Sequence, residues 1–465
     1  MKLPIFFFLA AAMLAGLLVE AVVRFRRPWA VPALAVYATT LMWYFLDLFV
    51  TPDGYTQFTE DVLNVSYRQV SLFLAAFRLL LPFVVGKLVG VGNPRQAVMR
   101  GSGLSPERLL GGVAILWLTL LVIGASMMNY DFIGALFPID ARAGSRMWSR
   151  DAAEGAGPTG FLVSTGSYLY MLTSALFGVL LFLVRGPGWR AMAAGFWILA
   201  LPYFLFSGTR SSFLAALMPG LLAFLFFNRQ KAWIKLAVCL LAFMAIDTSL
   251  KLVVTFRNVG FRGLLVEEER DEMVDKMGGH QGLNMIQELC FENMALDSGG
   301  IQQDWGQRYL VEISNAIPRP LWRNKPRIGI EYAIWRGFED LTGASDIGVV
   351  ATVSTGFIGG GVMSFGPIFG PLVPALIMAL WCGVLARWWL QSRSPLRACL
   401  FLAGLGVTAN LGRDLTLLVA WPIVFGYLIT LLIEKTGARP GYPTFVSPPA
   451  PVVPASYPAG SSSSR

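Results

Sequence analysis

Four cations lie within nine residues of one polar segment, Ile317–Arg327, which reads Ile-Pro-Arg-Pro-Leu-Trp-Arg-Asn-Lys-Pro-Arg. These cations are Arg319, Arg323, Lys325 and Arg327. The prolines between them restrict the backbone φ angle and stiffen the chain. Trp322 within the segment and Trp335 beyond it offer flat apolar faces of the kind on which sugar rings stack. A charged run is usually a solvated surface, but cations fixed by prolines beside tryptophan favour an anion-binding site.

A second arginine signal is the segment Ser207–Ser212, Ser-Gly-Thr-Arg-Ser-Ser, between two apolar runs. Its glycine permits a tight turn, and its hydroxyl side chains can cap helix ends. Arg210 is then expected near a helix N-terminus, where backbone N–H groups and the guanidinium together suit a phosphate. The alternative is an arginine that snorkels from a helix end. Arg336 and Arg413 can join the proline-bounded cations at 319–327, although Arg413 with Asp414 equally fits a neutral ion pair.

Groups for acid–base or metal chemistry are few. The single histidine, His280, lies in the sequence Gly-Gly-His-Gln-Gly, where it can donate to a phosphate or act as a base. An isolated histidine is more often structural or solvated, so both interpretations stay open. The four cysteines, of which only Cys290 lies in the polar segment, give no disulfide framework or Cys-x-x-Cys site. We therefore expect no metal and no cofactor.

Apolar helices must position these residues. Of the 465 residues, 55% are hydrophobic and 14% are charged, whereas about a quarter of a soluble domain is charged. A helix needs about 20 residues to cross roughly 30 Å of hydrocarbon. Eleven runs reach or approach that length: 4–23, 28–50, 67–91, 109–127, 161–184, 190–206, 211–228, 234–255, 364–386, 396–412 and 415–433. The sequence therefore predicts an all-α polytopic membrane protein with about 11 transmembrane helices.

The loops between these runs alternate in charge. Numbered in order, the odd loops carry many lysines and arginines and one acid, Glu107, whereas the even loops are mixed or acidic. Positive residues concentrate in cytoplasmic loops, so we expect the odd loops and the C-terminus inside and the N-terminus in the periplasm. The large polar segment and Arg210 then face outside. This topology also explains the net charge of +9 without a nucleic-acid partner.

Four regions follow from this topology. Residues 1–255 are expected to hold transmembrane helices 1–8, and 256–350 to form one large extracytoplasmic loop. Residues 351–435 hold helices 9–11, and the Pro-, Ser- and Gly-rich residues 436–465 are expected to be a disordered cytoplasmic tail. Residues 1–23 are expected to remain as the first helix, because three arginines follow this run and only one cation precedes it.

Three segments resemble the Wzy-type bacterial oligosaccharide repeat-unit polymerases, which make O-antigen and exopolysaccharide. Ser-Gly-Thr-Arg-Ser-Ser resembles the family's Ser-Gly-x-Arg, and Ile-Pro-Arg-Pro-Leu-Trp-Arg-Asn-Lys-Pro resembles its Ile-Pro-Arg-x-Leu-Trp-Pro-x-Lys-Pro. Residues 358–366 resemble its Ile-Gly-Glu-x-Tyr-x-Asn-Phe-Gly. The chain departs from this last pattern, because the family's Glu, Tyr and Asn fall on Gly360, Val362 and Ser364. It also has Arg323 where the family has proline.

The resemblance implies a metal-independent membrane glycosyltransferase of GT-C-like architecture in the bacterial inner membrane. It would transfer a growing glycan from undecaprenyl pyrophosphate to a new lipid-linked repeat unit, alongside a chain-length regulator and a flippase. Arg210 and Arg319 would bind the donor pyrophosphate, and Trp322 or Trp335 would stack on sugar. The expected supporting residues are Arg323, Lys325, Arg327, Arg336 and Arg413. The base stays open among His280, Glu331 and Asp346.

Two rival functions stay open. An O-antigen ligase-like enzyme would hand a finished glycan to a different acceptor, and it shares an arginine-rich outer loop. A lipid-linked oligosaccharide transporter or flippase would line a path through the membrane with ionisable residues. The apolar runs contain few such residues, namely Glu20, Asp47, Arg78, Asp247 and Lys251. We therefore place the polymerase before the ligase, and the ligase before the transporter.

Overall fold

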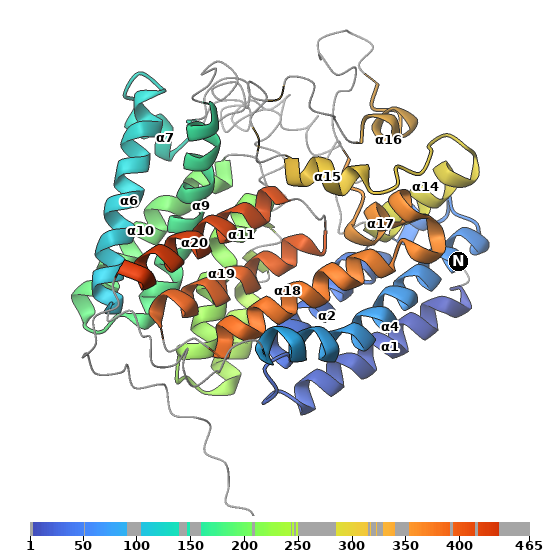
Figure 1. Cartoon of the computed structure of the whole chain (residues 1–465), viewed down its shortest axis with the longest axis horizontal. Coiled ribbons are helices and arrows are strands. Elements are labelled where there is room, and N and C mark those ends of the chain that lie inside the picture. The colour runs from blue at the N-terminus through green and yellow to red at the C-terminus, as the bar shows by residue number, and fades with distance from the viewer. Residues whose placement is uncertain are drawn as a thin grey trace, which may run out of the picture.

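The computed structural model of the chain is helical throughout, with no β-strand among the residues that it describes. The described residues are 3–50, 52–90, 104–138, 147–148, 160–206, 210–242, 244–245, 248–249, 285–314, 317, 322, 329–339, 353–390, 394–413 and 417–436. Figure 1 shows one bundle of long helices with shorter helices across its upper side.

Seven helical stretches among these residues are long and apolar enough to cross a membrane. They are α1 (Ile5–Val23), α2 (Ala30–Tyr44) continued by α3 (Leu46–Val50), α4 (Glu60–Gly90), α6 (Pro106–Ser126), α9 (Gly160–Leu183), α10 (Pro187–Phe206) and α18 (Leu372–Leu390). Shorter apolar helices are α11 (Arg210–Phe227), residues 232–242, α17 (Phe357–Phe369) and α19 (Pro395–Leu411). The last helix is α20 (Leu417–Thr436). The all-α membrane fold is confirmed, and the count of eleven spans stays a prediction.

The structure divides one of the expected membrane spans between two helices. The run 364–386 does not form a single helix, because α17 is interrupted at Gly366 and α18 begins only at Leu372. Gly366 has a left-handed φ of 78°, which glycine adopts without steric cost, and Pro367 lacks the N–H that a continuous helix would use. The hydrophobicity of the run conceals this break. The run 28–50 is likewise divided at Phe45 into α2 and α3.

The long helices pack as a bundle with a buried apolar core. α4 packs against α1 and α18, α9 packs against α6, α10 and α11, and α19 packs against α11, α20 and α2. Outward-facing apolar side chains such as Ile5, Val23 and Leu79 stay exposed on the bundle surface. Helices that are apolar on every side suit a lipid environment.

Three helices of the polar region 256–350 lie across one end of the bundle (Figure 1), and we call them the cap: α14 (Met285–Asp297), α15 (Gln307–Ser314) and α16 (Ile330–Trp335). The cap shares a small second core with α17, formed by Ala295, Ile301, Tyr332 and Met363. Trp335 packs against this core. The described residues of this region therefore form a folded layer.

Candidate functional site

The C-terminal end of α2 joins several elements at the cap end of the bundle. The Trp43 indole N–H donates to the Ala409 carbonyl in α19 at 2.8 Å, and the Thr39 hydroxyl donates to the same carbonyl at 3.0 Å. The guanidinium of Arg413 lies 5.9 Å from the centroid of the Trp43 ring. A cation over an indole face is attracted by the ring quadrupole. Arg413, an expected substrate-binding residue, is therefore held against α2.

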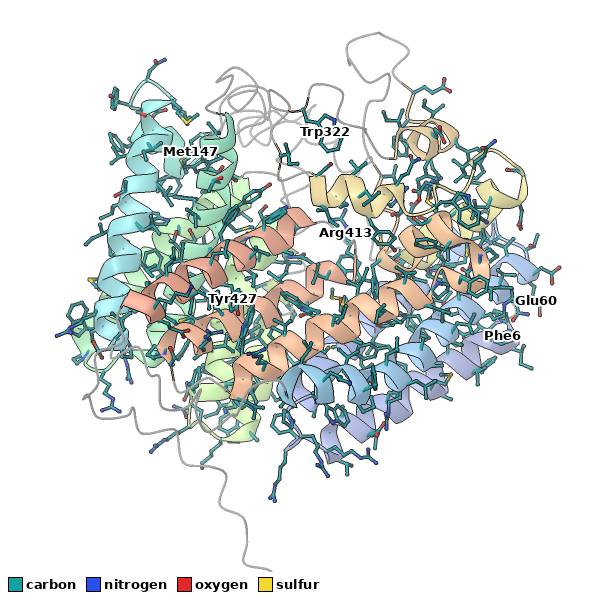
Figure 2. The ribbon with its side chains drawn as sticks, viewed as in Figure 1. Phe6, Glu60, Met147, Trp322, Arg413 and Tyr427 are labelled. Carbon is teal, nitrogen blue, oxygen red and sulfur yellow. The ribbon has the colours of Figure 1, made fainter. Side chains whose placement is uncertain are left out.

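The arginine of the Ser-Gly-Thr-Arg-Ser-Ser segment comes to the same end. α11 begins at Arg210, and the Asn410 side-chain amide donates to the Ser211 carbonyl at 2.8 Å. The start of α11 therefore contacts the end of α19. The contact residue Asn410 precedes Gly412 by two residues and Arg413 by three. Figure 2 shows Arg413 on the cap side of the bundle, with Trp322 above it in the same view. Two arginine segments about 200 residues apart in the chain thus meet.

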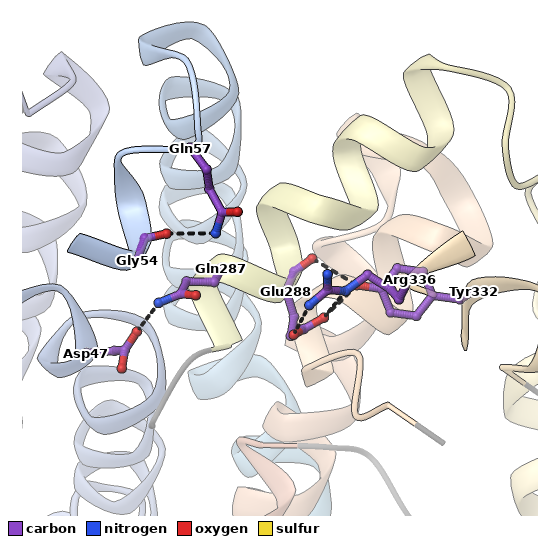
Figure 3. A network of polar contacts seen from close by, with 7 residues as sticks. All are labelled: Asp47, Gly54, Gln57, Gln287, Glu288, Tyr332 and Arg336. Carbon is purple, nitrogen blue, oxygen red and sulfur yellow. Dashed lines mark hydrogen bonds and ion pairs between the residues drawn. The ribbon is translucent and has the colours of Figure 1, made fainter. Parts of the chain in front are cut away.

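Arg336, another expected substrate-binding residue, has a carboxylate partner. Its Nε and Nη2 atoms donate to the two oxygens of Glu288 at 3.3 and 3.1 Å, and the Tyr332 hydroxyl donates to the same carboxylate at 2.6 Å (Figure 3). Its guanidinium also lies 3.6 Å from the Phe291 ring centroid. Burial and the nearby acids raise the pKa of Tyr332 well above its usual range, which keeps its hydroxyl protonated. The charge of Arg336 is compensated inside the cap.

The first turn of α14 also holds the cap to the bundle. The Gln287 amide donates to the Asp47 carboxylate at 2.7 Å (Figure 3), and the Tyr55 hydroxyl donates to the same oxygen at 2.8 Å. Asp47 is almost fully buried at the end of the α2–α3 stretch. A buried carboxylate needs such donors to offset its lost hydration. Asp47 is therefore anchored between the bundle and the cap.

A second row of contacts joins α14 to α4. The Gln69 and Asn293 amides exchange hydrogen bonds at 2.7 and 3.0 Å, and the Asn293 amide also donates to the Ser66 hydroxyl at 3.0 Å. The Cys290 thiol donates to Ser66 at 3.3 Å. Burial raises the pKa of Cys290 to about 12, so its thiol is protonated at neutral pH and is a poor nucleophile.

Glu292 is a buried acid near the glycine-rich start of α17 that the sequence analysis did not single out. It is fully buried in α14, and its carboxylate lies against Gly359 so closely that a Cβ at that glycine would overlap it. A Cβ at Gly360 would meet only ordinary contacts, with Thr355 Oγ1 at 3.5 Å and Arg308 Cδ at 3.7 Å. The signal in the sequence was the Glu288 and Glu292 pair, four residues apart in an otherwise apolar stretch.

Arg308 was also missed. It is mostly buried on α15, and its guanidinium donates to the Thr355 hydroxyl at 2.7 Å. Asp304 lies 3.7 Å from its Nε atom. The Ile358 N–H, at the start of α17, donates to the Tyr44 hydroxyl at 3.1 Å. The glycine-rich start of α17 is thus enclosed by α2, α14 and α15.

α15 has an exposed apolar side. Its exposed side chains include Leu310 and Ile313, and Trp305 before it and Ile317 after it are also exposed. Buried Val311 and Ser314 lie on the adjoining side of the helix. A helix with one charged, one packed and one exposed apolar side is typical of a membrane interface.

The remaining expected residues differ in how far the structure places them. Trp335 stacks on Tyr332 and lies against Gly300. Glu331 is exposed in the first turn of α16, and Trp322 is partly exposed. The residues that lie outside the described ranges are His280, Arg319, Arg323, Lys325, Arg327 and Asp346. The part of the chain that the structure describes holds no group of three or more metal-binding side chains.

No protein-family model, curated protein or solved structure matches this chain. The assignment of a function therefore depends on the geometry of the cap end and on the residues that form it.

Proposed function

We propose that this protein polymerises undecaprenyl-pyrophosphate-linked oligosaccharide repeat units at the outer face of the bacterial inner membrane. The observation that carries the proposal is the junction of α11 and α19, at which Asn410 binds the Ser211 carbonyl. It puts the Arg210 and Arg413 segments on neighbouring elements at the cap end. Arginines suit a pyrophosphate, because the guanidinium group binds phosphate oxygens in a bidentate manner.

In this proposal, arginine side chains contribute to catalysis by electrostatic stabilisation. Transfer of the glycan breaks its bond to pyrophosphate, and negative charge develops on the leaving oxygen. Cations positioned before the reaction stabilise that charge without reorganising solvent. Arg210 and Arg319 take this role in the proposal, with Lys325 and Arg327 in support. The proton of the acceptor hydroxyl passes to His280, Glu331 or Asp346.

The cap supports a lipid-linked substrate rather than a soluble one. The exposed Leu310 and Ile313 of α15 sit on the same layer as the polar network of α14 and α16. An interfacial helix of this kind lies at the level of lipid headgroups. The carrier lipid would then approach from the bilayer, and its pyrophosphate would reach the arginines at the headgroup level.

Gly360, where the chain departs from the resembled pattern, follows a glycine that packs against a buried carboxylate of the cap. The resembled pattern carries glutamate at this position, and here the carboxylate of Glu292 reaches the adjacent Gly359 from α14. The space that an extra side chain at Gly360 would occupy lies next to Arg308 and Thr355, which are a suitable environment for an acid.

The experiment is to replace the chromosomal gene by Arg210→Ala or Arg413→Ala and to resolve the lipid-linked glycans by gel and mass spectrometry. We expect loss of long polymer and accumulation of a single repeat unit on undecaprenyl pyrophosphate, at unchanged protein level. The matched control is Arg229→Ala, which removes an exposed arginine between α11 and residues 232–242. Normal polymer from both cap-end variants would contradict the proposal.

The same gels separate the alternatives. Long polymer that remains on its carrier after deletion of the gene would identify a ligase-like enzyme. Loss of a transporter would also leave single repeat units on their carrier, but on the cytoplasmic face of the membrane, where a membrane-impermeant glycan-labelling reagent does not reach them. The described intramembrane acids favour an enzyme, because Asp47 and Glu20 are each engaged by neighbouring donors rather than spaced along a path.

A further inference from the structure

A second charged site lies at the end of the bundle away from the cap. A cavity of about 380 Å³ is lined by Arg24, Arg27, Trp29, Arg78 and Pro82. It lies where α1 ends, α2 begins and the second half of α4 passes. Binding pockets for small ligands start at about 300 Å³, so this space accommodates a headgroup-sized molecule.

The arginines of this cavity outnumber their carboxylate partners. Arg78 donates to both oxygens of Glu20 at 2.7 and 2.6 Å, and Arg24 lies 2.8 Å from the same carboxylate. Glu20 is the one acid with which the described residues pair these cations. Three arginines and one glutamate leave two positive charges. An anion in the cavity would compensate them.

The side chains that line the cavity suit a phosphate group. Trp29 lies beside the arginines, and tryptophan is enriched where headgroups meet the hydrocarbon. Guanidinium groups bind phosphate oxygens in a bidentate manner. The lining thus combines charge, hydrogen-bond donors and an interfacial ring.

The surroundings of the cavity are apolar and face outward. Leu79 and Phe83 are exposed on α4 beside Arg78 and Pro82, and Val22 and Val23 are exposed at the end of α1. Acyl chains can lie along these side chains while a headgroup fills the cavity. A freely soluble anion would gain nothing from them. Basic pockets between transmembrane helices are known to take anionic lipid headgroups.

We propose that the cavity lined by Arg24, Arg27 and Arg78 binds a phosphate group, and that its source is an anionic phospholipid of the surrounding bilayer. The charge distribution of the loops predicts that this end faces the cytoplasm. The site is therefore separate from the proposed glycan-transfer site at the cap end, and its occupancy does not depend on that proposal.

The test is titration of the full-length protein in detergent with dioleoyl phosphatidylglycerol, followed by native mass spectrometry. The double variant Arg24→Gln/Arg27→Gln should bind about tenfold more weakly than the parent protein. Arg27→Gln alone should bind more weakly by a smaller factor, and it keeps all contacts of Glu20. The matched control Arg26→Gln removes an exposed arginine of the same turn that does not line the cavity, and its binding should be unchanged.

Two further titrations distinguish the sources of phosphate. Dioleoyl phosphatidylcholine has the same chains without net charge and should bind weakly to parent and variants alike. Inorganic phosphate or pyrophosphate should not compete with the anionic lipid. Competition at low millimolar concentration would overturn the lipid as the source. An equal loss of binding in Arg26→Gln, or none in the double variant, would overturn the cavity as the site.

Discussion

The two ends of the bundle each contain a glutamate–arginine pair, and the pairs differ in how their charge is balanced. In the cap, the side chains of Arg336 and Glu288 are 16% and 5% exposed, and the described residues give each charge one opposite partner. At the other end, the side chains of Arg78 and Glu20 are 32% and 21% exposed, and Glu20 also faces Arg24. One pair is enclosed and neutral, and the other is open and positive.

This difference separates a structural pair from a binding site. A buried ion pair with complete hydrogen bonds has little attraction left for a further charge, but the loss of one partner leaves an uncompensated ion. A partly exposed group with surplus cations can lose one arginine with a small loss in the free energy of unfolding, and it still attracts an anion. Arg336, which the sequence analysis expected to bind substrate, belongs to a buried and neutral ion pair of this structural kind.

The largest effect expected is at Arg336. Arg336→Met leaves the Glu288 carboxylate buried with only its tyrosine donor, and it should lower the free energy of unfolding by about 3–5 kcal/mol. The matched change Arg78→Met leaves Arg24 beside Glu20 and should cost only about 1–2 kcal/mol. Thermal unfolding in detergent, followed by tryptophan fluorescence, measures both. Equal losses at the two ends would remove the distinction between them.

An intermediate effect is expected where the cap meets α17. Gly359→Ala places a methyl group against the Glu292 carboxylate and should cost about 1–3 kcal/mol by overpacking. Gly360→Ala adds the same methyl group one residue later, where the nearest atoms are at 3.5 Å or more, and should be tolerated. The double variant Gly359→Ala/Glu292→Ala should recover part of the loss. A larger loss for Gly360→Ala than for Gly359→Ala would contradict this packing.

Much of the bundle could be predicted because bilayer thickness fixes the length of apolar runs. The predicted run 161–184 became α9 at Gly160–Leu183, and the run 396–412 became α19 at Pro395–Leu411. The prediction failed at Gly366 because a hydrophobicity window records the side chains of a run but not a change in backbone direction.

The partners of the site residues could not be predicted. Nothing local in the sequence pairs Arg413 with Trp43 or Asn410 with Ser211, because these contacts follow from helix packing across most of the chain. Glu292 looked like part of an ordinary helix, and only its packing against α17 distinguishes it. The proline-bounded cations at 319–327 stay a prediction, since the described ranges include only Trp322 of that stretch.

The smallest expected change in stability is at Arg24. This residue best separates a role in stability from a role in anion binding. Its side chain is 53% exposed and its pair with Glu20 joins neighbouring turns of α1, so Arg24→Gln should change the free energy of unfolding by about 0.5 kcal/mol or less. The same variant should bind phosphatidylglycerol several-fold more weakly, because it removes one of the two surplus charges of the cavity. Thermal unfolding and native mass spectrometry on one preparation measure both quantities. A large loss of stability with unchanged lipid binding would make this end of the bundle structural too, like the pair in the cap.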